Sequence, residues 1–233
     1  MNRTEPIEAV SFDAAGTLLF PHPSVGEIYA EIMAKHGLPL RPTELEAEFR
    51  RSFVEARKDP AIADSEEREY RYWKDIVAAS IDALATRPEN FDRLFEDLWT
   101  EFAKGSRWRL DVDTLALFDC LDELQIPFIL LTNWDRRVYQ VLSDHNILHR
   151  FAKIFVSSEL GCDKPDPSLF DRVATTIGIQ PRRILHLGDR LDTDVQGALD
   201  AGFQAAWIDA SPAPAPPGAR KLSRVGDLRS LFA

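Results

Sequence analysis

With 233 residues, 45% of them hydrophobic and 28% charged, the chain has the composition of an ordinary globular protein, either one sizeable domain or a core domain with a smaller insertion. Its formal net charge of −10 argues against a nucleic-acid partner and an anionic membrane surface, because both attract clustered Lys and Arg. Its two cysteines, Cys120 and Cys162, form neither a disulfide framework nor a metal-binding motif.

The sequence gives no signal for export or for membrane insertion. Residues 1–6 are polar with no apolar signal segment behind them, and no apolar run approaches the roughly 20 residues that span a bilayer. We therefore expect a cytoplasmic protein without a membrane partner. The sequence leaves the oligomeric state open.

The first predicted element is a short buried strand that enters a tight turn. Residues 7–12 form an apolar run with β-branched residues, closed by Asp13-Ala14-Ala15-Gly16-Thr17. Pro21 and Pro23 then bound a loop. This pattern places Asp13 at the carboxyl end of a strand.

From Val25 to about Ala103 the apolar residues follow a helical period. Breaks fall near residues 37–39, 59–60 and 87–88. Four helices with no strand between them predict a separate helical module, whose aromatic stripes indicate a helix–helix core. We place a helical cap at residues 23–104 and a core domain at residues 1–22 and 105–233.

After Gly105 strands and helices alternate along the chain. Strands are predicted at residues 128–131, 154–156, 184–187 and 205–208, and helices at residues 114–124, 136–145, 168–177 and 192–201. Such a βαβ series predicts an α/β fold, a Rossmann-like parallel sheet with right-handed crossovers. A Pro-rich loop at residues 211–218, a short element near Leu222 and a helix from Asp227 close the chain.

Polar residues follow the predicted strands where each strand ends. They are Asp13, Thr132-Asn133, Ser157-Ser158 and Asp189. A single Asp after a strand is usually a turn or cap residue. In open α/β sheets, however, ligands bind beyond the carboxyl ends of the strands, so four polar ends together with Lys164 indicate a shared site.

The charges of these residues favour a metal ion. Asp13 and Asp189 would raise each other's pKa unless a cation lay between them, and a hard cation such as Mg²⁺ prefers carboxylate oxygens. Asp194 is expected to be a direct or water-mediated ligand, and Asp192 to be the N-cap of the following helix. Lys164 could bind an anionic centre as a compact charge.

The same residues resemble the four ordered motifs of the haloacid dehalogenase (HAD) superfamily. Residues 12–18 resemble the first motif, 130–133 the second, Lys164-Pro165 the third and 188–198 the fourth. The helical stretch lies between the first two motifs, as in the IA-like subfamily with a C1-type cap. The HAD-like hydrolase domain-containing protein 3 group is similar in its long helical cap and its nonstandard residue after the nucleophile.

This resemblance implies a role for each matched residue. Asp13 would attack phosphorus and form a covalent aspartyl intermediate, while a set of oxygen ligands would hold Mg²⁺: the Asp13, Asp189 and Asp194 carboxylates and the Ala15 carbonyl. The transferring phosphoryl group would be bound by Thr132, the Asn133 amide and Lys164. The resemblance thus implies a Mg²⁺-dependent, phosphatase-type hydrolase acting on a small phosphorylated or activated substrate, with the cap closing over the site.

The sequence departs from the family pattern at Ala15. Most phosphatases of the family carry a second Asp there, which protonates the leaving oxygen. Because general acid–base help is worth roughly 10²–10⁴-fold, an alkyl phosphate should turn over slowly, and an acyl phosphate or an aryl phosphate less so. Two stand-ins are possible, His22 in the loop after the first motif and Asp135 after the second.

Three alternatives remain open. The chain could be a catalytically weak protein that binds a phosphorylated ligand. The L-2-haloacid dehalogenases have a similar first motif, but usually lack the counterpart of Asp189. Phosphonoacetaldehyde hydrolases also have Ala at the Ala15 position and use a cap lysine, whereas Lys35, Lys58 and Lys74 do not stand in the expected pattern.

Overall fold

A computed structural model describes residues 5–63 and 65–232, and the chain divides into two compact units. The sheet unit takes in the chain up to Phe20 together with residues 110–134 and 147–233, and the helical unit takes in residues 21–109 and 135–146. The predicted boundaries, after residues 22 and 104, stay a prediction. Residues 1–4, on which the expected absence of a signal segment partly rests, lie outside the described residues.

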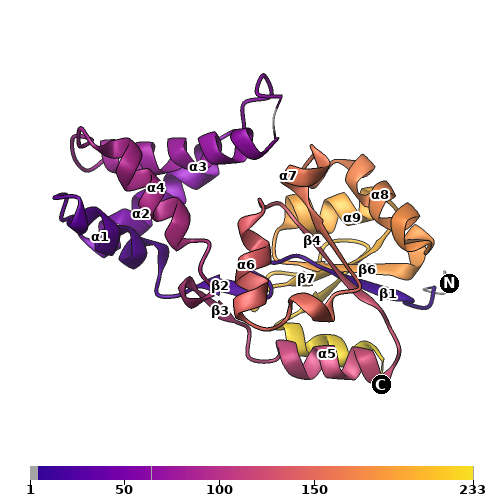
Figure 1. Ribbon diagram of the computed structural model, residues 1–233. Coiled ribbons are helices and arrows are strands. Elements are labelled where there is room, and N and C mark those ends of the chain that lie inside the picture. The colour runs from indigo at the N-terminus through magenta and orange to yellow at the C-terminus, as the bar shows by residue number, and fades with distance from the viewer. Residues whose placement is uncertain (1–4, 64, 233) are drawn as a thin grey trace. The chain divides into compact units, whose positions relative to one another are not determined.

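The sheet unit is built on a parallel sheet, which confirms the predicted Rossmann-like α/β core (Figure 1). Its six strands lie in the order β5-β4-β1-β6-β7-β8, and every neighbouring pair is parallel. The strands are β1 (Ala9–Phe12), β4 (Phe128–Thr132), β5 (Lys153–Val156), β6 (Ile184–Gly188), β7 (Gln204–Ile208) and β8 (Ala219–Leu222). The order reverses direction at β1, so the carboxyl end of β1 lies where open α/β sheets bind ligands.

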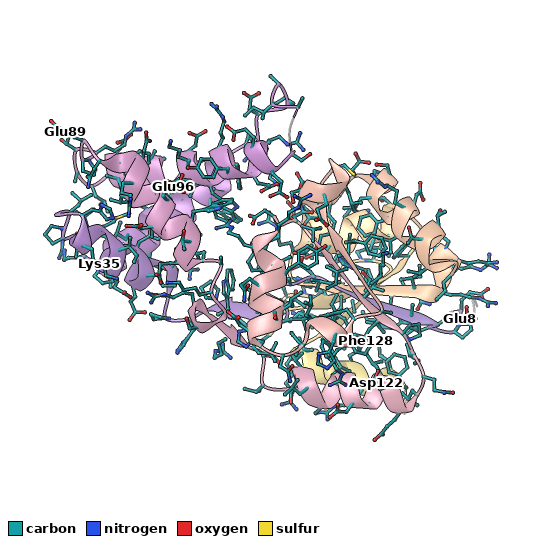
Figure 2. The ribbon with its side chains drawn as sticks, in the orientation of Figure 1. Glu8, Lys35, Glu89, Glu96, Asp122 and Phe128 are labelled. Atoms are coloured by element: carbon teal, nitrogen blue, oxygen red, sulfur yellow. The ribbon has the colours of Figure 1, made fainter. Side chains whose placement is uncertain are left out.

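Helices cover both faces of this sheet. Figure 1 shows α5 (Thr114–Glu123) on one face, and α8 (Pro167–Ile177) and α9 (Gly197–Asp200) on the other. On the α5 side the ring of Phe128, labelled in Figure 2, stacks on Phe118 with centroids 4.4 Å apart. On the α8 side Phe170 packs with the apolar residues of the strands. Burial on both faces explains why these strands are nearly continuous apolar runs.

Several elements differ from the predicted ones. β2 (Leu19–Pro21) pairs with β3 (Trp108–Leu110) in a two-stranded sheet, where a loop was predicted. The predicted helix at residues 192–201 is a π-helical turn, Leu191–Gln196, followed by the short α9, and the last helix is a 3₁₀ helix, Val225–Leu231. Strands of three residues are too short to give a periodic signal.

The helical unit contains the four predicted helices. They are α1 (Val25–Lys35), α2 (Pro42–Glu55), α3 (Ser65–Asp82) and α4 (Phe91–Glu101). The predicted aromatic stripes form its core, in which Tyr29 and Phe95 are buried. Lys35, Glu89 and Glu96, labelled in Figure 2, are exposed. Among residues 5–63 and 65–232, no helix combines the length and the apolar composition that a membrane span requires.

One further helix, α6 (Arg137–Asp144), groups with the helical unit although it follows the second motif. The Asp144 carboxylate accepts a hydrogen bond from the Gly105 N–H at 2.7 Å. The Arg137 guanidinium lies over the ring of Trp99, 3.4 Å from its centroid, and donates to the Trp99 carbonyl at 3.4 Å. These contacts tie α6 to segments that precede it by more than 30 residues.

Candidate active site

The turn after β1 is folded tightly around one carbonyl. The Ala14 carbonyl accepts the N–H groups of Thr17, Leu18 and Leu19 at 3.3, 2.8 and 2.9 Å, and the Asp13 N–H donates to Leu187 of β6 at 2.9 Å. Gly16 has a φ of +94°, and a Cβ there would come within 2.7–2.8 Å of the Asp189 carboxylate. Only glycine meets both demands, so the Gly of the first motif brings the two strand ends together.

The π-helical turn after β6 presents Asp194 to the same place. The N–H groups of Asp194 and Val195 both donate to the Arg190 carbonyl at 3.1 Å, and Asp194 Oδ2 accepts the Arg190 N–H at 3.0 Å. Asp194 therefore caps the turn, and the prediction that Asp192 is the N-cap is wrong. The Asp192 carboxylate instead pairs with the exposed Arg190 guanidinium at 3.1 Å. π-turns often occur at functional sites.

The second and third motifs meet through Asn133 and Lys164. Asn133 Oδ1 accepts the Lys164 backbone N–H at 2.7 Å, and its Nδ2 donates to the Lys164 carbonyl at 2.9 Å. Both polar atoms of this amide thus hold the backbone of Lys164, and phosphoryl binding by Asn133 stays a prediction. Thr132 is buried at the end of β4.

The polar residues after β5 bind the loop that follows β4. Ser157 and Ser158 begin α7 (Ser157–Leu160), where the Ser157 hydroxyl and the Ser158 N–H donate to the Trp134 carbonyl at 3.3 and 3.2 Å. Trp134 itself is buried, with 5% of its surface exposed. Ser157 and Ser158 thus hold the loop that follows Asn133.

Three carboxylates and one ammonium gather beyond the carboxyl ends of β1 and β6. One oxygen from each of Asp13, Asp189 and Asp194 lies within 4.8 Å of the others. The Lys164 ammonium lies 2.7 Å from Asp13 Oδ1 and 2.6 Å from Asp194 Oδ1. We call these four side chains the carboxylate cluster. With all four groups ionised, three negative charges face one positive charge.

This excess of negative charge shifts the pKa values of the carboxylate cluster. Burial and the neighbouring carboxylates raise the pKa of Asp13 from 3.8 to about 7, against the lowering effect of Lys164. Burial, with a contribution from the charge of Asp194, also raises the pKa of Asp189. Burial alone would raise the pKa of Asp194, but the charge of Lys164 lowers it. Burial would lower the pKa of Lys164, but its two carboxylate partners raise it.

The carboxylate cluster fits a hard divalent cation. Its oxygens are the ligand type that Mg²⁺ prefers, and one oxygen of each carboxylate lies within 4.8 Å of the other two. A cation there would offset the remaining negative charge and lower the raised pKa of Asp13, which keeps this carboxylate ionised. Ala15 belongs to the same turn, and its side chain is exposed. The role of its carbonyl as a ligand stays a prediction.

A comparison with protein-family models identifies the same family that the motifs resemble. The model of the haloacid dehalogenase-like hydrolases matches residues 7–202, which includes every member of the carboxylate cluster. The chain belongs to the haloacid dehalogenase-like hydrolase family. The predicted family and the prediction of a hydrolase are thereby confirmed.

Known proteins similar to this chain include a HAD-like hydrolase domain-containing protein, a phosphatase and a HAD-hydrolase of solved structure. The haloacid dehalogenase-like hydrolase domain-containing protein 3 of Mus musculus is 27% identical over 211 residues, 87% of this chain and 82% of that protein. The phosphoserine phosphatase of Thermus thermophilus is 40% identical over 86 residues, 37% of this chain and 34% of that protein. The HAD-hydrolase YfnB from Bacillus subtilis, solved bound to magnesium, matches with a TM-score of 0.74 at 17% identity, covering 98% of this chain and 99% of its own.

The two possible stand-ins for the missing acid belong to the helical unit. Both oxygens of Asp135 accept hydrogen bonds from the Arg137 guanidinium, at 2.8 and 2.7 Å, so this carboxylate is paired within the helical unit. His22 is exposed, and its backbone N–H donates to the Arg107 carbonyl at 2.8 Å. The lysines considered for a Schiff base, Lys35, Lys58 and Lys74, pair with Glu31, Glu69 and Asp92.

Sequence reasoning missed three polar residues in and beside the carboxylate cluster. The Thr17 hydroxyl donates to Asp189 Oδ1 at 3.4 Å. Ser11 and His186 form a hydrogen bond of 2.9 Å inside the sheet. The signal that could have revealed this pair is a polar residue within each of two otherwise apolar strands, Ala9–Phe12 and Ile184–Gly188.

Proposed function

We propose that the chain is a Mg²⁺-dependent, phosphatase-type hydrolase of a small phosphorylated or activated substrate, acting through an aspartyl intermediate on Asp13. The observation that carries this proposal is the carboxylate cluster, in which three buried or half-buried carboxylates face one ammonium. The relative named as a phosphoserine phosphatase supports a small-molecule substrate, and the expected cytoplasmic location belongs to the same proposal.

In the first proposed step, an Asp13 oxygen attacks phosphorus, and the bond from phosphorus to the leaving oxygen breaks. Lys164, held between Asp13 and Asp194, supplies a positive charge for the phosphoryl oxygens, and Thr132 lies at the adjacent strand end. Asp189, Asp194 and the Ala15 carbonyl would complete the Mg²⁺ ligands with Asp13. Bound Mg²⁺ would supply charge stabilisation for the transferring phosphoryl group.

The residue at Ala15 decides which substrates turn over. Its methyl group cannot protonate a leaving alkoxide or deprotonate the water that hydrolyses the intermediate. Since that help is worth roughly 10²–10⁴-fold, we propose that good substrates carry a leaving group that needs no proton, such as a carboxylate or an acidic phenolate. The same absence favours the second candidate, a protein that binds a phosphorylated ligand with little turnover.

The test is a substrate panel measured with Mg²⁺ and with EDTA. Acetyl phosphate, p-nitrophenyl phosphate, an alkyl phosphate and 2-chloropropionate are offered to the wild type, Asp13→Asn and Ala15→Asp. We expect turnover of the first two substrates with Mg²⁺, and a loss of at least roughly 10³-fold in Asp13→Asn. Asp171→Asn, an exposed carboxylate on α8, is the matched control and should keep full activity.

The outcomes separate the candidate functions. Ala15→Asp should raise alkyl phosphate turnover by about 10²-fold or more, because the exposed position accepts the longer side chain. Binding of phosphate and Mg²⁺ without turnover of acetyl phosphate would favour the binding protein. Chloride release that survives EDTA would identify a dehalogenase, and full activity of Asp13→Asn would refute the proposed nucleophile.

A further inference from the structure

Two polar side chains meet inside the sheet, beneath the carboxylate cluster. Ser11 of β1 and His186 of β6 are register partners, and Ser11 Oγ lies 2.9 Å from His186 Nδ1. Their exposed fractions are 0% and 1%. Burying polar groups between central strands costs free energy, and valine or leucine would fill the same space without that cost.

The far end of the imidazole ring faces Asp194. His186 Nε2 lies 3.5 Å from Asp194 Oδ1, the oxygen that also accepts a hydrogen bond from Lys164. This distance is longer than a hydrogen bond, and within the part of the chain that the structure describes the buried Nε2 has no hydrogen-bond partner. The ring of Phe170 packs edge-on against the imidazole at 87°, with centroids 5.6 Å apart. Ser11 and Phe170 thus fix the ring so that Nε2 points at Asp194.

The charge of Asp194 selects one tautomer of the ring. A proton on Nδ1 would leave the Nε2 lone pair facing a carboxylate oxygen, which is repulsive. A proton on Nε2 would place an N–H dipole there and leave Nδ1 to accept the Ser11 hydroxyl proton. The Ser11 hydroxyl can donate in this direction, so its contact with His186 is kept in the Nε2–H form that Asp194 selects.

We propose that His186 is a positioning residue, held by Ser11 as the Nε2–H tautomer, whose N–H orients the Asp194 carboxylate in the carboxylate cluster. This inference rests on the proposed function, in which Asp194 is a Mg²⁺ ligand. Asp194 Oδ2 is held by the Arg190 N–H at 3.0 Å, and Oδ1 is drawn toward Lys164 at 2.6 Å. Asp194 Oδ1 then faces two donors from different directions, the Lys164 ammonium and the His186 N–H. The His186 N–H therefore opposes rotation of the carboxylate toward Lys164. Partners of this kind contribute about 10–100-fold to metal affinity.

The test compares two amide variants that each replace one nitrogen of the ring. In His186→Gln the amide reaches the position of Nε2 and keeps a donor for Asp194. In His186→Asn the shorter amide takes the position of Nδ1, so the contact with Ser11 is kept and the donor is lost. Mg²⁺ affinity is measured by calorimetry, the unfolding midpoint is measured in EDTA, and the tautomer of His186 is read from long-range ¹H–¹⁵N NMR spectra of the EDTA-treated wild type.

We expect the Nε2–H tautomer in the wild type. His186→Asn should weaken Mg²⁺ binding by about 10–100-fold, while His186→Gln should stay within a few-fold of the wild type. The two variants should unfold at similar temperatures in EDTA, since both place an amide in the same buried space. Ser11→Ala should release the ring from its fixed orientation and weaken Mg²⁺ binding in the same direction as His186→Asn.

The inference is overturned by an Nδ1–H ring in the wild type, or by equal Mg²⁺ affinities of the Asn and Gln variants. Its failure is distinct from failure of the proposed function. If the wild type binds Mg²⁺ but hydrolyses no phosphate, the proposed function fails while the Asn–Gln difference still decides the role of His186. If the wild type binds no Mg²⁺, both fall together.

Discussion

The two units each bury a charge cluster, and the clusters differ in balance. In the helical unit Asp135 and Arg137 pair one to one, with hydrogen bonds of 2.8 and 2.7 Å, and the guanidinium is covered by the ring of Trp99. In the sheet unit the carboxylate cluster sets three carboxylates against the single ammonium of Lys164. A balanced pair satisfies itself, whereas an unbalanced cluster can be completed by a cation. Balance therefore distinguishes the self-contained pair from the cluster that we propose to bind Mg²⁺.

The largest effect should come from removing the cation of either cluster. Lys164→Met and Arg137→Met each leave a buried carboxylate without its partner, which costs about 3–5 kcal/mol. For a chain of this size, that loss lowers the unfolding midpoint by roughly 6–20 °C. We expect excess Mg²⁺ to restore part of the loss in Lys164→Met and none of it in Arg137→Met. Calorimetric unfolding with EDTA and with Mg²⁺ measures both, and equal responses to Mg²⁺ would remove the distinction between the clusters.

The next effect is a dependence of stability on pH that the carboxylate cluster should produce. Burial lowers the pKa of the adjacent His186, which opposes this effect below about pH 6.5. The folded pKa of Asp13, about 7, lies above its ordinary value of 3.8, so the folded protein holds this proton more tightly than the unfolded chain does. In EDTA the free energy of unfolding should therefore fall as the pH rises from about 4 to about 7, by up to about 1.4 kcal/mol per pH unit.

The raised pKa of Asp189 adds to this fall in the same direction, while the lowered pKa of Asp194 acts only below the ordinary range of an Asp. Denaturant titrations at several pH values measure the slope. Asp13→Asn should make this fall less steep than in the wild type. Equal slopes for the wild type and Asp13→Asn would show that Asp13 stays ionised.

Replacing both partners of a pair tests the balance directly. Asp135→Leu combined with Arg137→Met removes a self-contained pair, so we expect the double variant to recover most of the loss of Arg137→Met, to within about 1–2 kcal/mol of the wild type. Asp13→Leu combined with Lys164→Met leaves Asp189 and Asp194 facing each other and should recover little. Chemical unfolding of the four variants decides between these outcomes, and equal recovery would contradict the comparison.

The smallest effect concerns the backbone that carries Asp189. The Trp207 indole N–H donates to the Asp189 carbonyl at 2.9 Å, and the Trp108 indole N–H donates to the Phe102 carbonyl at 3.0 Å in the helical unit. Trp207→Phe and Trp108→Phe should each lose about 1 kcal/mol of stability. Only Trp207→Phe should also weaken Mg²⁺ binding, by a few-fold in calorimetry. A matching change in Trp108→Phe would show that the effect is general.

The features that the sequence predicted correctly depend on local residue patterns and on one rule of sheet topology. Alternating elements predicted the parallel sheet, and the rule that strand ends converge predicted that Asp13, Asp189 and Lys164 belong to one site. The short motifs also located Asp194, although its π-turn was predicted as an ordinary helix. Glycine at position 16 could be quoted as part of a motif, but the close approach of Asp189 that requires it appears only in the folded turn.

What the sequence did not predict depends on register and on distant contacts. Ser11 meets His186 across 175 residues only because β1 and β6 pair in one particular register. Asn133 looked like a ligand of phosphate, since nothing local shows that both of its polar atoms bind the backbone of Lys164. α6 follows a core motif in the sequence, and its contact with Trp99 comes from 38 residues away.

The grouping of α6 with the helical unit has a consequence for protein engineering. The chain passes between the units at residues 20–21, 109–110, 134–135 and 146–147, so the helical unit is not a single insertion. A chimera that exchanges residues 21–109 alone for the cap of another family member would separate Asp144 from Gly105 and Arg137 from Trp99. A transferable module must therefore consist of two segments, with residues 135–146 moved together with the four helices.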